Sequence, residues 1–454
     1  MPSRRLPVRT GSRHALEQCH CVQPIRPSWP ACLDTACHVP RKRGIHSLMN
    51  FQGKSRVKPA PGPLFALALA SIALIGPLAV HLFMPVIPAV KAAFAVSDAV
   101  AQLTFSIALF AMAFATLAYG SLADRYGRRP VLLSGLCLFL VGSVISAIAD
   151  TAWALVLGRL VQAIGAGCGM TLVRTIARDA YGPDRLVKVL AYLTMFYTIG
   201  PMISPAIGGI LVDTFGWRSV FGFALLLGSV IALAAYLAVY ETRPRAETAQ
   251  AGPGVLGGYV ALFAHPRFTA FVLQSGFCSA SFMTAASASA TLMPEYLHRP
   301  PTEFGLYFLA FPLGYFGGNL IASRVGNRVS VETMVLAGSL VNLAAAAGQC
   351  GWLLSGSMMP LALFLPGFFM TMGQGIAMPY GQAGAMATMP QLAGTAAGVG
   401  VFMQFFLGAA FAQLYGVFAD GTPGPMMVIV ALAAALALIT GVVPALLARR
   451  NRSP

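Results

Sequence analysis

The sequence is poor in charged residues, and above all in acidic ones. Of its 454 residues only 10% are Asp, Glu, Lys or Arg, and only 14 are Asp or Glu. Soluble globular domains carry about 25% charged residues, so this chain cannot cover a water-exposed surface of ordinary polarity. The shortage excludes a soluble enzyme and a soluble nucleic-acid-binding protein, even though 30 Lys and Arg give a net charge of +16.

Signature motifs of several other protein classes are also absent. The sequence contains neither G-x-S-x-G nor H-E-x-x-H, which mark many serine hydrolases and zinc peptidases, and no Walker sequence for binding ATP. These absences exclude a membrane enzyme of those kinds and an ATP-driven transporter, and we expect no cofactor and no metal site. The cysteines beyond residue 60 lie singly in apolar stretches, so no disulfide framework is expected.

Residues 1–60 concentrate positive charge without a long apolar run. They contain eleven Lys and Arg and two acidic residues, which accounts for +9 of the net charge. This composition is typical of disorder, and the missing apolar run argues against a cleaved secretory signal. One interpretation is that Met49 is the true start and that residues 1–48 are either mis-called sequence or an inert arm. The other is a zinc site, although the spacing fits no usual zinc finger. The cysteines concerned are Cys19, Cys21, Cys32 and Cys37.

Hydrophobic residues are abundant, at 57% of the total. From Leu64 onward they form apolar runs of about 20 residues, the length that an α-helix needs to cross a bilayer. We predict an all-α integral membrane protein with twelve transmembrane helices in two six-helix bundles, 61–240 and 268–447. A polar, Pro/Gly-rich linker at 241–267 joins the bundles, and a tail follows at 448–454. The predicted spans are 64–88, 99–119, 131–149, 153–173, 190–212, 219–240, 268–292, 305–322, 333–354, 359–380, 394–415 and 425–447.

The positive charges indicate how these spans are oriented. Fifteen Lys and Arg lie in alternate loops and the C-terminal tail, whereas the opposite loops hold only Lys91, Arg218 and Arg299. Because cytoplasmic loops carry the excess of Lys and Arg, we expect both termini in the cytoplasm. A weak repeat supports two related halves, since Arg, Gly and Arg recur in register in the loops 124–129 and 323–328.

The loop after span 2 carries the most specific motif. Residues 120–129 read Gly-Ser-Leu-Ala-Asp-Arg-Tyr-Gly-Arg-Arg and resemble the G-x-L-a-D-r-x-G-r-r signature of the major facilitator superfamily. Gly120 would permit close helix approach, and Gly127 a backbone conformation with positive φ. Asp124 can meet a helix N-terminus or the arginines, which predicts a charge latch that breaks when the bundles rock. The alternative is a basic loop that only sets topology. The latch residues are Gly120, Asp124, Arg125, Gly127, Arg128 and Arg129.

Span 4 contains a second motif with an unusual charge. Residues 159–167 resemble the superfamily motif R-x-x-Q-G-x-G, with Ala163 in place of the first glycine. Arg159 is the only Lys or Arg within a predicted span. A charge there costs about 2.5–3.5 kcal/mol on insertion scales, so it should face a cavity or a partner. In relatives this arginine is associated with proton transfer. The alternative is that Arg159 snorkels toward the periplasmic end, about two turns away.

Span 5 contains a third motif. Residues 200–209 resemble the antiporter pattern G-x-x-x-G-P-x-x-G-G, with Ser204 in place of one glycine. Its prolines each remove a helix hydrogen bond and bend the span, and its last glycines allow tight contact. In the superfamily this pattern marks exporters that exchange substrate for protons. The alternative is an ordinary kinked and tightly packed helix, which explains why prolines and glycines occur here but not why they have the spacing of the antiporter motif. The motif residues are Gly200, Pro201, Pro205, Gly208 and Gly209.

Further segments resemble the Bcr/CflA-type multidrug resistance exporters, a group of twelve-span drug:proton antiporters. These segments are 84–88, 178–179, 215–221 and 303–308. The similarity is good over 64–240 and loose over 268–447. Those relatives usually carry an Asp four residues before Pro85, where this chain has His81. Since no acidic residue lies within a predicted span, His81 is the best-placed group to exchange a proton. Alternatively, His81 stays neutral and hydrogen-bonded in the kink.

The resemblance implies a secondary active transporter of a bacterial inner membrane, which exports drugs or small amphipathic metabolites in exchange for protons by alternating access. The alternative is a major facilitator importer of a sugar, a nucleoside or another small metabolite, which the span 5 motif disfavours. We expect a monomer whose partners are a small-molecule substrate, protons and the lipid bilayer, and no nucleic acid. His81 and Arg159 are the candidates for proton coupling. Met and aromatic side chains suit bulky substrates. The candidate substrate-binding residues are Phe83, Met84, Gln162, Tyr197, Phe282, Gln374 and Gln404.

Overall fold

The structure is a computed structural model that describes residues 61–242 and 255–450. The expected N-terminal arm, its zinc alternative and residues 451–454 lie outside the described residues. Within the described ranges every regular element is a helix, as the long apolar runs predict. The all-α fold class is therefore confirmed.

The first half of the described chain supplies six spans. Span 1 is interrupted, because α1 and α2 end at Ala73 and His81, the residues whose carbonyls Pro77 and Pro85 leave without a helix donor. Gly182, with a positive φ of 66°, interrupts α6 and separates spans 4 and 5. The elements are α1 (Pro63–Ala73), α2 (Ile75–His81), η1 (Met84–Val86), α3 (Ile87–Phe94), α4 (Asp98–Tyr126), α5 (Arg128–Ala147), α6 (Ala152–Phe215) and α7 (Arg218–Ala238).

The second half begins with a helix that the sequence does not predict. This helix, α8, occupies Val255–Phe263 within the range 241–267 that is expected as a linker, so part of that range is helical. The elements that follow are α9 (Pro266–Glu295), α10 (Pro301–Tyr307), α11 (Ala310–Val325), η2 (Gly326–Arg328), α12 (Val331–Leu354), α13 (Pro360–Thr388), η3 (Pro390–Leu392), α14 (Ala393–Phe418) and α15 (Gly424–Arg450).

Eleven segments of the described chain are helical, long and apolar enough to cross a membrane. The twelfth span is α9, which has 30 residues but many Ser and Thr. These side chains are buried by α13, α14 and α15. Several bond to their own helix, as Ser289 Oγ does to the carbonyl of Ala285 at 2.7 Å. Because protein rather than lipid surrounds α9, its polarity is tolerated, and the count of twelve is confirmed.

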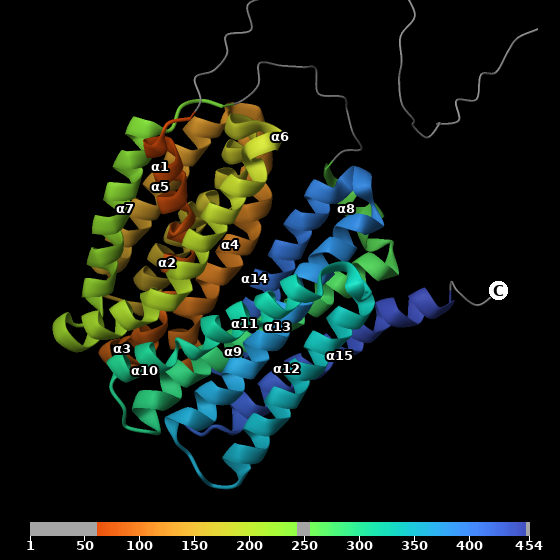
Figure 1. Ribbon diagram of the computed structural model, residues 1–454. Coiled ribbons are helices and arrows are strands. Elements are labelled where there is room, and N and C mark those ends of the chain that lie inside the picture. The colour runs from red at the N-terminus through yellow and green to blue at the C-terminus, as the bar shows by residue number, and fades with distance from the viewer. Residues whose placement is uncertain (1–60, 243–254, 451–454) are drawn as a thin grey trace, which may run out of the picture. The chain divides into compact units, whose positions relative to one another are not determined.

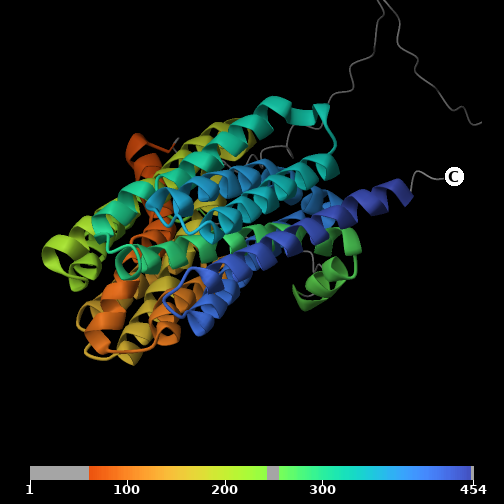
Figure 2. The same ribbon diagram turned by 90° about the horizontal axis from the view of Figure 1, so that it is seen from below.

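The helices form two groups, each packed mainly within itself. The first group, α1–α7, and the second group, α9–α15, appear as separate sets in Figures 1 and 2. Small residues bring helices together inside a group. At Gly165 of α6, for example, the backbone of Phe139 in α5 lies where a Cβ would stand. Such contacts allow backbones to approach closely where the hydrophobic effect does not drive association.

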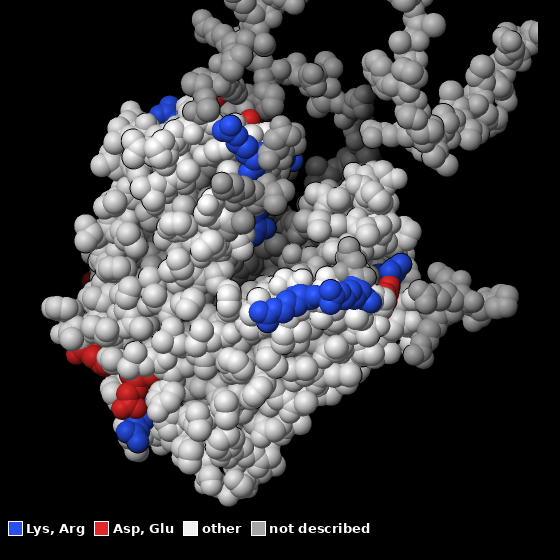
Figure 3. Space-filling model, viewed as in Figure 1, with Lys and Arg blue, Asp and Glu red and all other residues white. Residues whose placement is uncertain are grey.

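The two groups meet at one end and separate at the other. α4 packs against α14 from Gln102 and Gly416 near the closed end as far as Leu117 and Gly398, and at the closed end the second part of α6 packs against α10. We define this closed end by residues 88–98, 205–216, 293–305 and 413–422. Toward the opposite end a hollow opens between the groups, with Lys or Arg side chains on its walls (Figure 3).

Candidate transport site between the helix groups

His81 lies at the end of α2, where the two groups face each other. Its ring is buried and lies 6.5 Å from the ring of Phe282 in α9 and 6.0 Å from that of Phe308, between centroids. Nδ1 lies 3.0 Å from the carbonyl oxygen of Pro77, one helical turn earlier. Because a carbonyl can only accept, Nδ1 donates in this bond, and Nε2 is the atom that can take up a further proton. His81 therefore makes the hydrogen bond expected if the ring stays neutral within the kink. Its Nε2 is nevertheless available to accept a proton.

Arg159 is completely enclosed in the first group. Its Nε donates to the carbonyl of Thr104 at 3.2 Å, and Nη1 donates to Oε1 of Gln162 at 2.6 Å. The guanidinium carbon lies 4.2 Å from the centre of the Phe83 ring. With 1% of its surface exposed, the side chain does not snorkel to the membrane surface, so that alternative is wrong.

The charge of Arg159 is not balanced by a neighbouring acid. None of the ion pairs among the described residues includes it, and its Nη2 has no hydrogen-bond partner there. Dipoles and the face of an aromatic ring are the groups that stabilise the cation. An uncompensated buried charge is costly, which is typical of a group kept for function.

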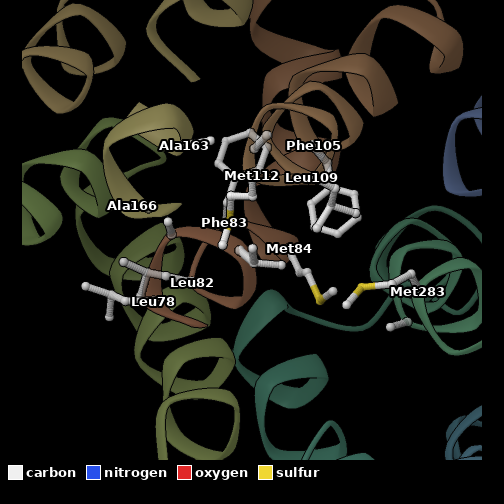
Figure 4. Packing of buried hydrophobic residues seen from close by; sticks show 14 of the residues in the cluster. Leu78, Leu82, Phe83, Met84, Phe105, Leu109, Met112, Ala163, Ala166 and Met283 are labelled. Carbon is white, nitrogen blue, oxygen red and sulfur yellow. The ribbon is translucent and has the colours of Figure 1, made fainter. Parts of the chain in front are cut away.

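Three of the candidate substrate residues surround this arginine or lie beside it. Gln162 accepts from Arg159 and donates to Oγ of Ser143 at 2.9 Å. Phe83 lies beneath the guanidinium, and Met84 points toward Met283 of α9 (Figure 4). Gln162, Phe83 and Met84 are all buried, so none faces the hollow in this structure. Their contact with substrate stays a prediction.

The remaining candidates lie on α9, α13, α14 and the second part of α6. Phe282 contacts His81, whereas Gln374 turns its amide into the second group and donates to Oγ of Ser279 at 3.1 Å. Gln404 has a buried Nε2 that finds no hydrogen-bond partner in the described part of the chain. Tyr197, in the second part of α6, is partly buried.

Arg128 ties three helices of the first group together at the open end. Its Nη1 donates to Oδ1 of Asp124 in α4 at 2.6 Å, and its Nε donates to Oδ2 of Asp179 in α6 at 3.1 Å. The arginine is only 6% exposed, so its charge-assisted bond to the enclosed Asp179 lies largely out of water, whereas the side chain of Asp124 is exposed. All three residues belong to the first group, so these bonds do not join the two groups.

The turn between α4 and α5 explains part of the signature around residues 120–129. Gly127 has a φ of 102°, which confirms the expected positive φ. The first N–H groups of α5, from Arg128 and Arg129, donate to the carboxylate of Glu241 at 3.0 and 3.1 Å, so Glu241 and not Asp124 meets this helix N-terminus, whereas Asp124 binds an arginine. Gly120 has no atom within 4 Å of an added Cβ, so the expected close helix approach there is wrong.

The glycines of the span 5 motif are contact points for other helices. A Cβ at Gly200 would lie 2.6 Å from Cβ of Pro77, and one at Gly208 would lie 2.9 Å from Cγ of Pro85, both in span 1. A Cβ at Gly209 would lie 2.8 Å from the carbonyl carbon of Pro301, which belongs to the second group. The motif therefore packs span 5 against the His81 segment on one side and against α10 on the other.

Polar contacts join the groups at the closed end. Nζ of Lys91 lies 2.6 Å from Oδ1 of Asp98 and 2.9 Å from Oε2 of Glu295, and only Glu295 belongs to the second group. Asp213 of α6 accepts hydrogen bonds from the amide and the hydroxyl of Thr302 in α10, the former at 2.9 Å. A surface hollow of about 590 Å³ lies beside the Lys91–Glu295 pair. Sequence reasoning missed these contacts because their partners are far apart along the chain.

Sequence reasoning also missed Arg174. The predicted span 4 ends at residue 173, but the helix continues to Gly182, which places Arg174 within the span rather than in a loop. The available signal was Gly182-Pro183, the first helix-breaking pair after Arg159. Arg159 is therefore not the only arginine in this helix.

Comparisons with known proteins agree with this architecture. The family model described as Major Facilitator Superfamily matches residues 69–412. The chain belongs to the major facilitator superfamily. It is 27% identical over 333 residues to multidrug resistance protein D of Escherichia coli strain K12, which covers 73% of this chain and 82% of that protein. It is 32% identical over 189 residues to multidrug resistance protein MdtL of Escherichia coli, and this match spans only about half of MdtL, 48% of its length.

Solved transporters share the fold at low sequence identity. A bacterial homolog of the human lysosomal transporter Spinster, in an inward-facing and unoccupied conformation, matches with a TM-score of 0.66 and 17% identity, covering 85% of this chain and 95% of that one. The D-xylose-proton symporter matches with a TM-score of 0.67 and 14% identity, covering 84% and 96%. Membership of the superfamily identifies a multi-pass membrane transporter of small molecules, not an enzyme.

Proposed function

We propose that this transporter exports drugs or small amphipathic metabolites across a bacterial inner membrane in exchange for protons, as a member of the Bcr/CflA-type exporters. The observation that carries alternating access is the one-ended closure, in which the groups touch at residues such as Gly209 and Pro301 and separate at the other end. The drug cargo is supported by the similarity to multidrug resistance protein D over 82% of its length.

The loop charges support an assignment of the two ends. The loops of the closed end carry Lys91, Arg218 and Arg299, whereas the far larger share of Lys and Arg lies at the open end. By the positive-inside rule the closed end faces the periplasm, the hollow opens to the cytoplasm, and both termini are cytoplasmic. A substrate would then enter the hollow from the cytoplasm or the inner leaflet and leave after the closed end has opened.

His81 is the residue we propose for proton exchange. It lies on the first group and contacts Phe282 and Phe308 of the second, so rocking of the groups changes the surroundings of its ring. Protonation of Nε2 would place a positive charge among aromatic rings, which favours a state in which water reaches that nitrogen. Arg159 lies on the same side of the gap and fixes the segment around Phe83.

The test combines drug susceptibility with efflux driven by a pH gradient in everted membrane vesicles. The wild type should confer resistance to at least one compound of a drug panel and show gradient-dependent transport of it. His81→Ala should lose coupling, and His81→Asp, which restores the residue of the relatives, should retain it. A wild type without resistance and without gradient-dependent efflux would refute the exporter proposal, and full coupling in His81→Ala would refute the role of His81.

A further inference from the structure

The surface hollow at the closed end lies between the two helix groups. Its volume is about 590 Å³. The first group supplies one wall, with Pro88 and Ala92 of α3, and the second group supplies the other, with Pro294 of α9 and Pro301 of α10. Contacts between α3 and α9 hold the two walls beside each other. Since each group supplies one wall, the complete hollow exists only while this end is closed.

The walls of the hollow are apolar except for one ion pair. Lys91 and Glu295 line the hollow, and its other lining residues are proline, alanine or valine. Nζ of Lys91 lies 2.9 Å from Oε2 of Glu295 and 2.6 Å from Oδ1 of Asp98. Two carboxylates therefore share one ammonium group, and the three side chains together carry a charge of −1. Between 23% and 28% of each side chain is exposed, so a solute in the hollow can approach this charge.

The surroundings of the hollow are also acidic. The segments that form the closed end contain five acidic and two basic residues, which gives a net charge of −3 with His298 neutral, whereas the whole chain carries +16. Arg218, just beyond these segments, lies 3.7 Å from Asp150, which offsets its charge. A surface of one sign attracts ions of the opposite sign, so this end should concentrate cations. The acidic residues are Asp98, Asp213, Glu295, Glu303 and Asp420, and the basic residues are Lys91 and Arg299.

These walls and charges fit an organic cation with an apolar body. Contact with proline and alanine removes apolar surface of the ligand from water, which contributes affinity of about 25 cal/mol per Å². A quaternary ammonium ion has no N–H group, so contact with apolar walls leaves no hydrogen-bond donor unsatisfied. An anion would instead meet Glu295 beside a lysine that is already paired, which disfavours its binding.

We propose that this hollow binds a small amphipathic organic cation and that the bound cation holds the closed end shut. A ligand that binds one form better than another shifts the equilibrium toward that form, so the cation should inhibit rocking of the groups and therefore transport. The inhibition rests on the proposed function, in which the closed end faces the periplasm and must open to release substrate. The binding does not depend on it.

Two probes of opposite charge test the binding. We would titrate benzyltrimethylammonium and benzylsulfonate, which are similar in size, into the full-length protein in phosphatidylcholine nanodiscs, with empty nanodiscs as the blank. The ammonium probe should bind the wild type about tenfold more tightly than the sulfonate, or better. Equal affinities for the two probes would show an apolar groove without charge preference and would overturn the proposal.

A matched pair of variants locates the bound probe. Ala92→Trp places an indole in the hollow and should weaken ammonium binding about tenfold or more. Ala93→Trp is the control, because Ala93 is exposed on the same helix but does not line the hollow, and it should change the affinity less than about twofold. Unchanged binding in a folded Ala92→Trp protein would place the probe elsewhere and overturn the proposal.

Asp98→Asn tests the charge without removing the ion pair between the groups. Asp98 does not line the hollow, and its pair with Lys91 lies within the first group. The substitution brings the charge of the three side chains to zero, so ammonium affinity should fall about threefold while sulfonate affinity does not fall. An unchanged ammonium affinity would refute the role of charge. If Ala92→Trp does not fold, this variant still decides whether the site recognises a cation.

Transport measurements separate the site from the export function. In spheroplasts, where an added solute reaches the periplasmic side, benzyltrimethylammonium should inhibit drug efflux by the wild type and by Ala93→Trp but not by Ala92→Trp. Efflux that continues when the probe is bound would overturn the inhibition and leave export standing. Conversely, ammonium binding that depends on Ala92 and Asp98, in a protein without any gradient-driven efflux, would support the binding site and refute export.

Discussion

Replacing Gly209 by alanine should open the closed end. An added Cβ would lie 2.8 Å from the carbonyl carbon of Pro301 and 3.0 Å from Cα of Thr302. Carbon atoms in contact prefer separations of about 3.5–4.0 Å, so α6 and α10 would have to move apart by about 0.7–1.2 Å. Both clashing groups are backbone, so no side-chain rotation can relieve the overlap.

The size of the effect follows from this overlap. Inserting one carbon into a packed contact costs about 1–3 kcal/mol. Gly209 and Pro301 belong to different groups, so the cost falls on the closed form and is relieved once the groups separate. The equilibrium should then shift toward opening of this end by about 5-fold to 150-fold.

The shift can be measured as a distance between spin labels. Ser97 precedes α4 and Thr422 follows α14, so labels there report on the two groups at the closed end. In a background without native cysteines, Gly209→Ala should populate longer distances by double electron–electron resonance. Gly222→Ala in α7 is the matched control, because no atom lies within 4 Å of its added Cβ. An unchanged distance distribution in a folded Gly209→Ala protein would refute the argument.

Three further variants have defined expectations. Glu295→Gln should destabilise the closed end by about 0.2–1 kcal/mol, because its ion pair with Lys91 is partly exposed, and the distance between the same spin labels should increase. Asp98→Asn is the control, because its ion pair with Lys91 stays within the first group and the distance should not change. Arg159→Met should abolish transport without lowering the melting temperature, because the apolar side chain removes an uncompensated buried charge. A large fall in the melting temperature would instead show that Arg159 has a structural role. Gly127→Ala should cost about 1–3 kcal/mol of stability because of its positive φ, whereas Gly120→Ala should change the melting temperature little.

The sequence predicts the spans well because lipid imposes a simple rule on them. A backbone in the bilayer must bond to itself, so each crossing needs a long apolar helix, and twelve such runs can be read directly. The rule is weakest where protein replaces lipid, which is why α9 is the most polar span. It also fails at helix ends, since span 4 continues past residue 173 until Gly182 interrupts it.

The site was only partly predictable from the sequence. Positive φ at Gly127 follows from local chemistry, and tight contact at Gly209 follows from a local motif. The partner of Gly209 could not be predicted, because Pro301 is distant in sequence and comes close only through docking of two groups.

Contacts within the first helix group are stronger than the polar contacts between the two groups, which favours a motion in which the two groups rock against each other. Inside the first group Arg128 binds the exposed Asp124 and the enclosed carboxylate of Asp179. The bond to Asp179 is charge-assisted and shielded from water, which makes it the stronger of the two. The links between groups include the partly exposed Glu295 pair, worth about 0.2–1 kcal/mol, and the exposed bonds of Asp213 to Thr302. A bond from Gln413 to the carbonyl of Ala99 and the packing of α4 against α14 add to them. A ligand that favours one form tenfold contributes about 1.4 kcal/mol, comparable with one such link. A bound ligand can therefore shift the closed end without breaking the bonds of Arg128, which join helices within one group and not the two groups to each other.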